Sequence, residues 1–159
     1  MLSSILLGVI LVFSLFLYTF VANYAFMDFY KRLETRSNST ARIQLDPGNK
    51  HFEHFKKEYL VTLPEEKNYV IAINAEANLK ELAETHKVSF ELLQKIKKKG
   101  VANYRHQNVL YCGIKYIAKT GNEYYVITSA KNYYFKELMN YLLKLLLVLI
   151  SCSTLLVAL

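Results

Sequence analysis

The sequence contains few of the residues from which catalytic or cross-linked sites are built. It has two cysteines, Cys112 and Cys152, which are too few for a disulfide framework. Its five glycines are scattered, so it has no glycine-rich loop that could cradle a phosphate. Groupings of Ser, His and Asp, or of Cys and His, at motif spacing are also absent. We therefore expect neither a catalytic site nor a cofactor in these 159 residues.

Charge is nearly missing from both ends of the chain. Met1–Met27 contains no charged side chain, and Leu138–Leu159 contains only Lys144. A helix needs roughly 20 apolar residues to cross a bilayer, so both segments are predicted to be transmembrane helices, at residues 1–27 and 137–159. For the first segment the alternative is a cleaved signal peptide, which would have a basic start and a shorter apolar run. We expect an uncleaved anchor.

Residues 28–136 are predicted to form one domain, which carries the whole net charge of +7 because Glu137 and Lys144 cancel. A basic excess could suit anionic ligands, lipid headgroups or nucleic acid. Acidic residues are interspersed with the basic ones, which is typical of a solvated surface, and no nucleic-acid partner is expected. A count of positive charges would place the domain in the cytoplasm, but that rule loses force for loops longer than about 60 residues. Charge therefore leaves the orientation open.

An amphipathic helix is predicted to continue the first span over residues 28–45. Apolar and small residues recur at three- and four-residue steps, and Asp46-Pro47-Gly48 is a strong turn signal. This stripe could pack on the domain's own sheet or against a second copy of the chain in a parallel dimer, and we expect a mixture in which its aromatic end and its small-residue end have different partners. Its members are Phe26, Phe29, Tyr30, Leu33, Ser37 and Ala41.

A second short helix is predicted from Phe52, Phe55 and Tyr59, which lie on one helical face. It contains His51-x-x-His54, a spacing that permits two ligands on one metal. Two histidines do not make a metal site, so these are read as solvent-facing and no metal is expected.

The rest of the domain alternates strands with one well-marked helix. That helix runs from the N-cap Ser89 to Gly100, with Phe90, Leu93 and Ile96 predicted to be buried and lysines crowding its last turns. Residues 75–85 are ambiguous between strand and helix. The predicted strands are Asn68–Asn74, one starting at Ala102, Val109–Ala118 and Glu123–Ala130.

Several short motifs in this order resemble the PAS-like (Cache-type) extracytoplasmic sensor domains of bacterial receptors. They are most similar to the input region of sensor histidine kinases of the kind common in Bacteroidota. The matching stretches are Phe29–Leu33, Leu63–Lys67, Glu91–Gly100 and Tyr124–Ala130. The chain departs from that group at Lys80–Ala83, where the family has a Tyr-Ser-Ser-like second strand, and at Asn132 and Phe135, where it has Asp and Gly.

The resemblance implies an α+β fold with a five-stranded antiparallel sheet between two transmembrane helices. It implies a bacterial inner-membrane protein with a periplasmic domain, working as a parallel homodimer. Kinase domains beyond Leu159 would pass the signal to a cytoplasmic response regulator. A chemoreceptor or cyclase, or a bitopic envelope-assembly protein with no enzymatic role, remain as alternatives.

A small-molecule ligand of unknown identity would bind among aromatic residues and cations on the last strands. The alternative is plain strand alternation, with half-buried tyrosines and a solvated lysine. The candidate ligand-binding residues are Tyr104, Arg105, Tyr111, Lys115, Tyr116 and Tyr124.

Overall fold

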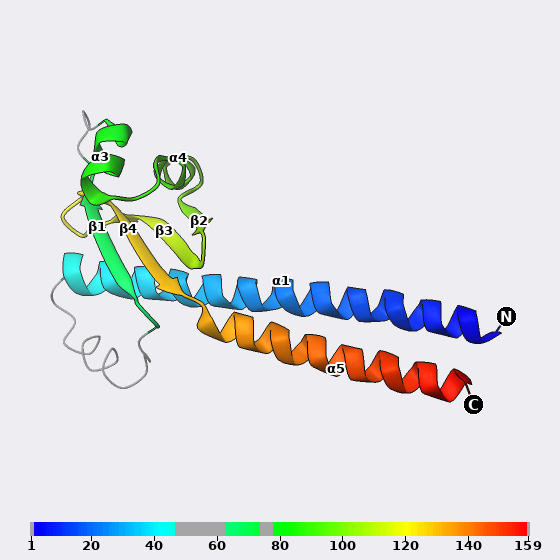
Figure 1. Ribbon diagram of the computed structural model, residues 1–159. Helices are drawn as coiled ribbons and strands as arrows, with labels where there is room; N and C mark the ends of the chain where they lie inside the picture. Colours follow the sequence, from blue (N-terminus) through cyan, green and yellow to red (C-terminus); the bar gives the residue numbers. More distant parts are fainter. Residues whose placement is uncertain (1, 47–62, 74–77, 159) are drawn as a thin grey trace. The chain divides into compact units, whose positions relative to one another are not determined.

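The computed structural model describes residues 2–46, 63–73 and 78–158 and divides the chain into two compact units (Figure 1). One unit consists of Met1–Asp28 and Tyr133–Leu159, and the other of Phe29–Asn132. Helix α1 (Leu2–Leu45) contributes to both units. The fold class is α+β, as predicted.

The terminal unit consists of the first half of α1 together with helix α5 (Tyr133–Ala158). Both helices are long and apolar enough to cross a membrane. Most of their large apolar side chains are exposed, including Val12 at 71% and Leu145 at 62%. A core helix of a water-soluble protein would bury such side chains, so this exposure favours a lipid environment. Within the unit, the rings of Phe26 and Phe135 lie 4.1 Å apart.

The central unit is built on a four-stranded antiparallel sheet in the order β1-β4-β3-β2. The prediction of a five-stranded antiparallel sheet is therefore confirmed only in part. The sheet is antiparallel, but no fifth strand is found among the described residues. The last two strands lie within one residue of their predicted bounds. The strands are β1 (Lys67–Ala72), β2 (Val101–His106), β3 (Val109–Ile117) and β4 (Glu123–Lys131).

The ambiguous stretch after β1 contains a helix, α3 (Leu79–His86). Its start is fixed by Asn78, whose side chain accepts a hydrogen bond from the Lys80 N–H at 3.0 Å. Its end is fixed by Lys87 in the left-handed conformation. The local capping chemistry, together with the helix-forming residues Ala, Glu, Leu and Lys, explains why this segment is helical.

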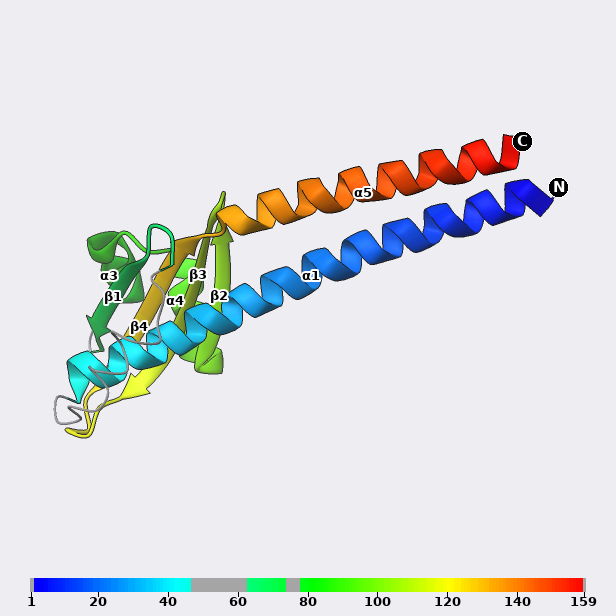
Figure 2. The same cartoon turned by 90° about the horizontal axis from the view of Figure 1, so that it is seen from below.

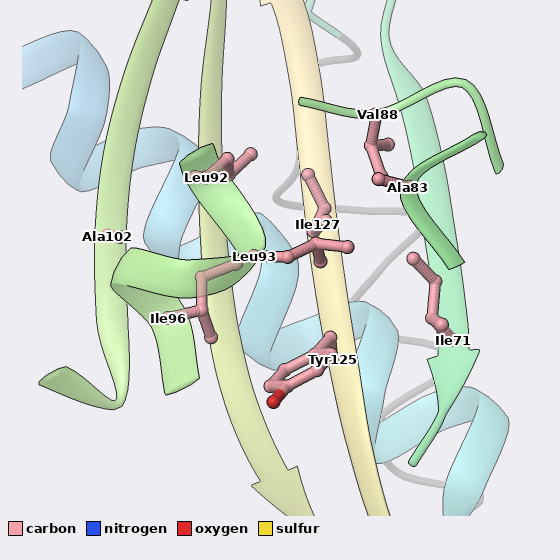
Figure 3. Packing of buried hydrophobic residues seen from close by; sticks show 9 residues of the cluster. All are labelled: Ile71, Ala83, Val88, Leu92, Leu93, Ile96, Ala102, Tyr125 and Ile127. Carbon is pink, nitrogen blue, oxygen red and sulfur yellow. The ribbon is translucent and has the colours of Figure 1, made fainter. Parts of the chain in front are cut away.

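One face of the sheet is covered by α3 and α4 (Phe90–Lys99), and the apolar core lies between them and the strands (Figure 3). The prediction for α4 was wrong at one position, because Phe90 is 41% exposed and Leu92 takes its place in the core. Ser89 is the N-cap, as predicted, although its side chain makes no capping hydrogen bond. A Cβ at Gly113 would clash with Ile96, so this glycine allows α4 to approach the sheet closely.

The opposite face of the sheet is covered by the last turns of α1 (Figures 1 and 2). Leu33, Ser37 and Ala41 have no exposed surface, so the predicted stripe packs on the domain's own sheet. The predicted second helix and its two histidines, like Pro47 and Gly48 of the predicted turn, lie outside the described residues.

Candidate functional site

The six predicted ligand-binding residues do not form one cluster. Side chains alternate between the two faces of a strand, so neighbouring residues point in opposite directions. Tyr104 and Tyr111 pack against the core under α3 and α4, on the face that Lys115 shares by alternation. Tyr116 and Tyr124 pack on the face covered by α1.

The same alternation places Arg105 on the α1 face, one residue after Tyr104. Lys115 forms an ion pair with Glu123, with 2.8 Å between Nζ and Oε2. The two predicted cations therefore lie on opposite faces and do not converge on one ligand.

Three tyrosines gather on the α3–α4 face. The rings of Tyr104 and Tyr111 lie opposite each other on β2 and β3, with centroids 6.0 Å apart. Burial, and then the neighbouring phenols of Tyr69 and Tyr104, raise the pKa of Tyr111 above its usual value. Because its pKa is raised, the Tyr111 phenol stays neutral at physiological pH and can pack and hydrogen-bond.

A buried polar contact joins α1 to the sheet on the opposite face. The Ser37 hydroxyl oxygen lies 3.0 Å from the Thr128 hydroxyl oxygen and 3.1 Å from the Cys112 carbonyl oxygen. The Thr128 hydroxyl donates to the Asn68 side-chain oxygen at 2.7 Å. Ser37 and Thr128 have no exposed surface. One hydrogen-bonded group thus connects α1 with β1, β3 and β4.

The polar contact continues from Asn68 to the start of β1. The Asn68 amide donates to Glu66 Oε1 at 3.1 Å, and Glu66 Oε2 accepts from the Leu63 N–H at 3.2 Å. Arg36, which is nearly buried on α1, places Nε 3.5 Å from Glu66 Oε2. We call Arg36, Ser37, Glu66, Asn68 and Thr128 the helix–sheet network.

The polar groups of the network stabilise the fold less than an apolar contact would, but they fix the position of α1 on the sheet. An apolar contact of the same shape would avoid the cost of desolvating hydroxyls and an ion pair. Hydrogen bonds are directional, so they fix which residue of α1 sits over which residue of β4. The sequence analysis read Ser37 only as a small residue in a stripe, because helical periodicity reports a face but not a polar partner.

Two hydrogen bonds to Asp46 form a second contact between the end of α1 and the sheet. The Tyr116 hydroxyl donates to Asp46 Oδ2 at 2.6 Å, and the Lys119 N–H donates to Asp46 Oδ1 at 2.9 Å. These hydrogen bonds lower the pKa of Asp46, and the bond to Asp46 raises the pKa of Tyr116. The last turn of α1 is thereby tied to β3 and to the turn that follows it.

The end of β4 is fastened to the turn before β1. The Lys131 N–H donates to the Pro64 carbonyl at 3.0 Å, and Lys131 Nζ lies 2.7 Å from Glu65 Oε2. Pro64 and Glu65 belong to the Leu-Pro-Glu-Glu-Lys stretch that the sequence analysis singled out. The sequence alone gave no reason to expect that this stretch would contact the last strand.

Comparisons with protein-family models, curated proteins and solved structures gave no match. The functional argument therefore depends on the geometry and on the motifs.

Neither a reactive thiol nor a metal-binding group is found near the helix–sheet network in the described part of the chain. Cys112 is free and buried, and burial raises the pKa of its thiol to about 12, with a smaller effect from Glu34. A neutral buried thiol is a poor nucleophile and a poor metal ligand. Within residues 2–46, 63–73 and 78–158 no three His, Cys, Asp or Glu residues are grouped to hold a metal ion.

Proposed function

We propose that this chain is the membrane-anchored input region of a bacterial two-component sensor histidine kinase. In this proposal α1 and α5 span the inner membrane, and the central unit is a PAS-like sensor domain in the periplasm. The protein works as a parallel homodimer. A stimulus at the domain is passed through α5 to kinase domains beyond Leu159, and from there to a response regulator.

The observation that carries the proposal is the short connection between the sheet and α5. Strand β4 ends at Lys131 and α5 begins at Tyr133, so one residue separates a central strand from an apolar helix. Residues 131–137 contain neither Gly nor Pro. Since flexible linkers need such residues, displacement of β4 is expected to be transmitted along the chain rather than absorbed.

In this proposal a stimulus shifts an equilibrium between two arrangements of the helix–sheet network. Ser37 on α1 and Thr128 on β4 are in direct contact, and each such hydrogen bond contributes a net free energy of about 1 kcal/mol. Reversing a two-state equilibrium from 1:99 to 99:1 requires about 5.5 kcal/mol of differential binding. A few exchanged hydrogen bonds at this contact would supply part of this free energy, and the stimulus would supply the rest by binding one state more tightly than the other.

The motifs that suggested the family occupy matching elements, which supports the proposal. The Leu-Pro stretch at residues 63–67 precedes the first strand. The stretch 91–100 covers all of α4 but its first residue, together with the C-cap Gly100. The stretch 124–130 lies in β4, the strand that leads into α5.

The orientation is tested by labelling single cysteines in intact cells of a Gram-negative host, in a chain carrying Cys112→Ser and Cys152→Ser. Lys119→Cys is exposed in the turn after β3, so a membrane-impermeant maleimide should label it without lysis. The matched control is Leu149→Cys within α5, which should stay unlabelled in both intact and lysed cells. Labelling of Lys119→Cys only after lysis would contradict a periplasmic domain.

The output is tested on the full-length gene product in membrane vesicles, where autophosphorylation is measured with labelled ATP. A Gly-Gly insertion between Asn132 and Tyr133 should uncouple activity from the domain. The control is the same insertion after Gly121, in the exposed turn before β4. Equal kinase activity in both insertions would contradict transmission through β4. A full-length product without a kinase would favour a chemoreceptor, a cyclase or an envelope-assembly protein.

A further inference from the structure

Strand β2 forms one edge of the sheet in the described part of the chain. The Lys115 N–H donates to the Gly100 carbonyl at 2.7 Å, which identifies Gly100 and Lys115 as a hydrogen-bonded pair. In an antiparallel ladder every second residue of a strand bonds to the same neighbour. The N–H and C=O groups of Val101, Asn103 and Arg105 therefore point away from β3.

This edge has few of the features by which proteins block unwanted strand pairing. Natural edges are shortened, bulged or interrupted by proline. Strand β2 pairs with β3 without a bulge from Val101 to His106, and it contains no proline. Val101 is 41% exposed, and Asn103 and Arg105 are also exposed. The backbone is thus ready to accept another strand.

This edge is protected by positive charge, which repels a second basic strand and attracts an acidic one. Residues 97–106 contain Lys97, Lys98, Lys99 and Arg105, and they contain no acidic residue. Two copies of this edge would repel each other, which disfavours β2–β2 pairing. The opposite edge, β1, begins directly after the acidic pair Glu65-Glu66.

We propose that β2 binds an acidic, extended polypeptide segment of a partner protein as a fifth strand of the sheet. The partner's backbone would pair with the outward-pointing groups of β2, and its carboxylates would meet Lys97, Lys98 and Lys99 just before the strand. This mode gives affinity through main-chain hydrogen bonds and selectivity through charge. The inference does not depend on the proposed kinase function, because it concerns only the sheet edge.

The test uses the full chain in phosphatidylcholine nanodiscs and a fluorescein-labelled nine-residue peptide of alternating Glu and Val. Fluorescence anisotropy should show binding that weakens with salt. A peptide of alternating Lys and Val should not bind. An acidic peptide with a central proline should bind at least about tenfold more weakly, because proline removes one main-chain donor.

The matched protein variants place proline at the two edges. Asn103→Pro removes an N–H that points away from β3, so it breaks no ladder bond and is tolerated on an edge. It should weaken peptide binding at least about tenfold. Ala72→Pro makes the same change at the β1 edge, where the Ile73 N–H donates to the Glu123 carbonyl and Ala72 therefore points outward. It should leave binding unchanged.

Amide exchange on the unmodified chain provides a test that needs no variant. The peptide should slow exchange at Val101, Asn103 and Arg105 and leave Ala102 and Tyr104, which already bond to β3, unchanged. Equal binding to both proline variants, or unaltered exchange at the three edge amides, would show that only the lysines attract the peptide and would overturn the proposal. Slowed exchange with phosphatidylglycerol vesicles instead of the peptide would also overturn it, in favour of a lipid surface.

Discussion

The Ser37–Thr128 contact allows a double-mutant cycle whose result can be worked out from the structure. Ser37→Ala removes one buried hydroxyl from α1. The Thr128 hydroxyl keeps its bond to Asn68 and loses one partner. The Ala118 N–H donates to the Asn122 carbonyl, so by alternation the Cys112 carbonyl also accepts from the Thr128 N–H. It is therefore not left unpaired when Ser37 is changed.

The expected magnitudes follow from these remaining partners. Ser37→Ala loses one hydrogen bond, worth about 1 kcal/mol, and gains about 0.5 kcal/mol of helix propensity, so it should lower the free energy of unfolding by about 0.5 kcal/mol. Thr128→Val should lower it by about 1 kcal/mol, because Ser37 retains the Cys112 carbonyl and Asn68 can reach water. The double variant should be more stable than the sum of the two by only about 0.5 kcal/mol, because both single variants lose the Ser37–Thr128 contact but Ser37 keeps its bond to the Cys112 carbonyl in Thr128→Val.

The assay is urea unfolding of the full chain in detergent micelles, followed by the near-UV circular dichroism of its 13 tyrosines. Thr35→Ala is the control for helix propensity. Thr35 is exposed and its hydroxyl bonds only to the Lys31 carbonyl one turn earlier, so this change should stabilise the domain slightly. A coupling energy below about 0.3 kcal/mol would mean that the two hydroxyls do not interact, and the helix–sheet network would lose its central link.

Three further predictions concern other parts of the domain. Gly113→Ala should lower the free energy of unfolding by about 1–3 kcal/mol, because its methyl group displaces Ile96; an unchanged urea midpoint would contradict the close packing. The pKa of Asp46 is lowered in the folded state, so its carboxylate should stabilise the domain above the ordinary pKa of 3.8, and this stabilisation should disappear as pH falls through the lower folded value. In Asp46→Asn, thermal unfolding should lose that part of its acid dependence. Because burial raises the pKa of Cys112 to about 12, its thiol in a Cys152→Ser chain should react with iodoacetamide at pH 8 only after urea is added, and prompt labelling of that folded variant would show that the strand is open.

The sequence predicted the elements that have strong local signals. Strand β3 alternates, β4 is rich in β-forming residues, and a Lys-Thr-Gly-Asn turn separates them, so their positions could be found to within a residue. Helix α4 has Ser89 and Gly100 at its ends. Its buried face was harder to assign, because both Phe90 and Leu92 are apolar and only the packing on β2 and β3 decides between them.

The candidate ligand-binding residues lie on two faces of the sheet for a reason that the sequence already contained. Tyr104 and Arg105 are adjacent in a strand, as are Lys115 and Tyr116, and adjacent strand residues face opposite sides. The helix–sheet network could not be predicted, because it joins three segments that are far apart in the chain: residues 36–37, residues 66–68 and residue 128. Serine and threonine at such positions are common on any surface, and only the fold brings them together.

The strand order has a consequence for how the protein is made. In the described sheet β1 pairs only with β4, so the first strand of the domain can join the sheet only after the last strand is available for pairing. The sheet cannot close until Lys131 has left the ribosome, when α5 is the next segment to emerge. A nascent chain arrested before β4 has emerged would therefore lack a protease-resistant core, whereas one arrested after α5 has emerged would have it.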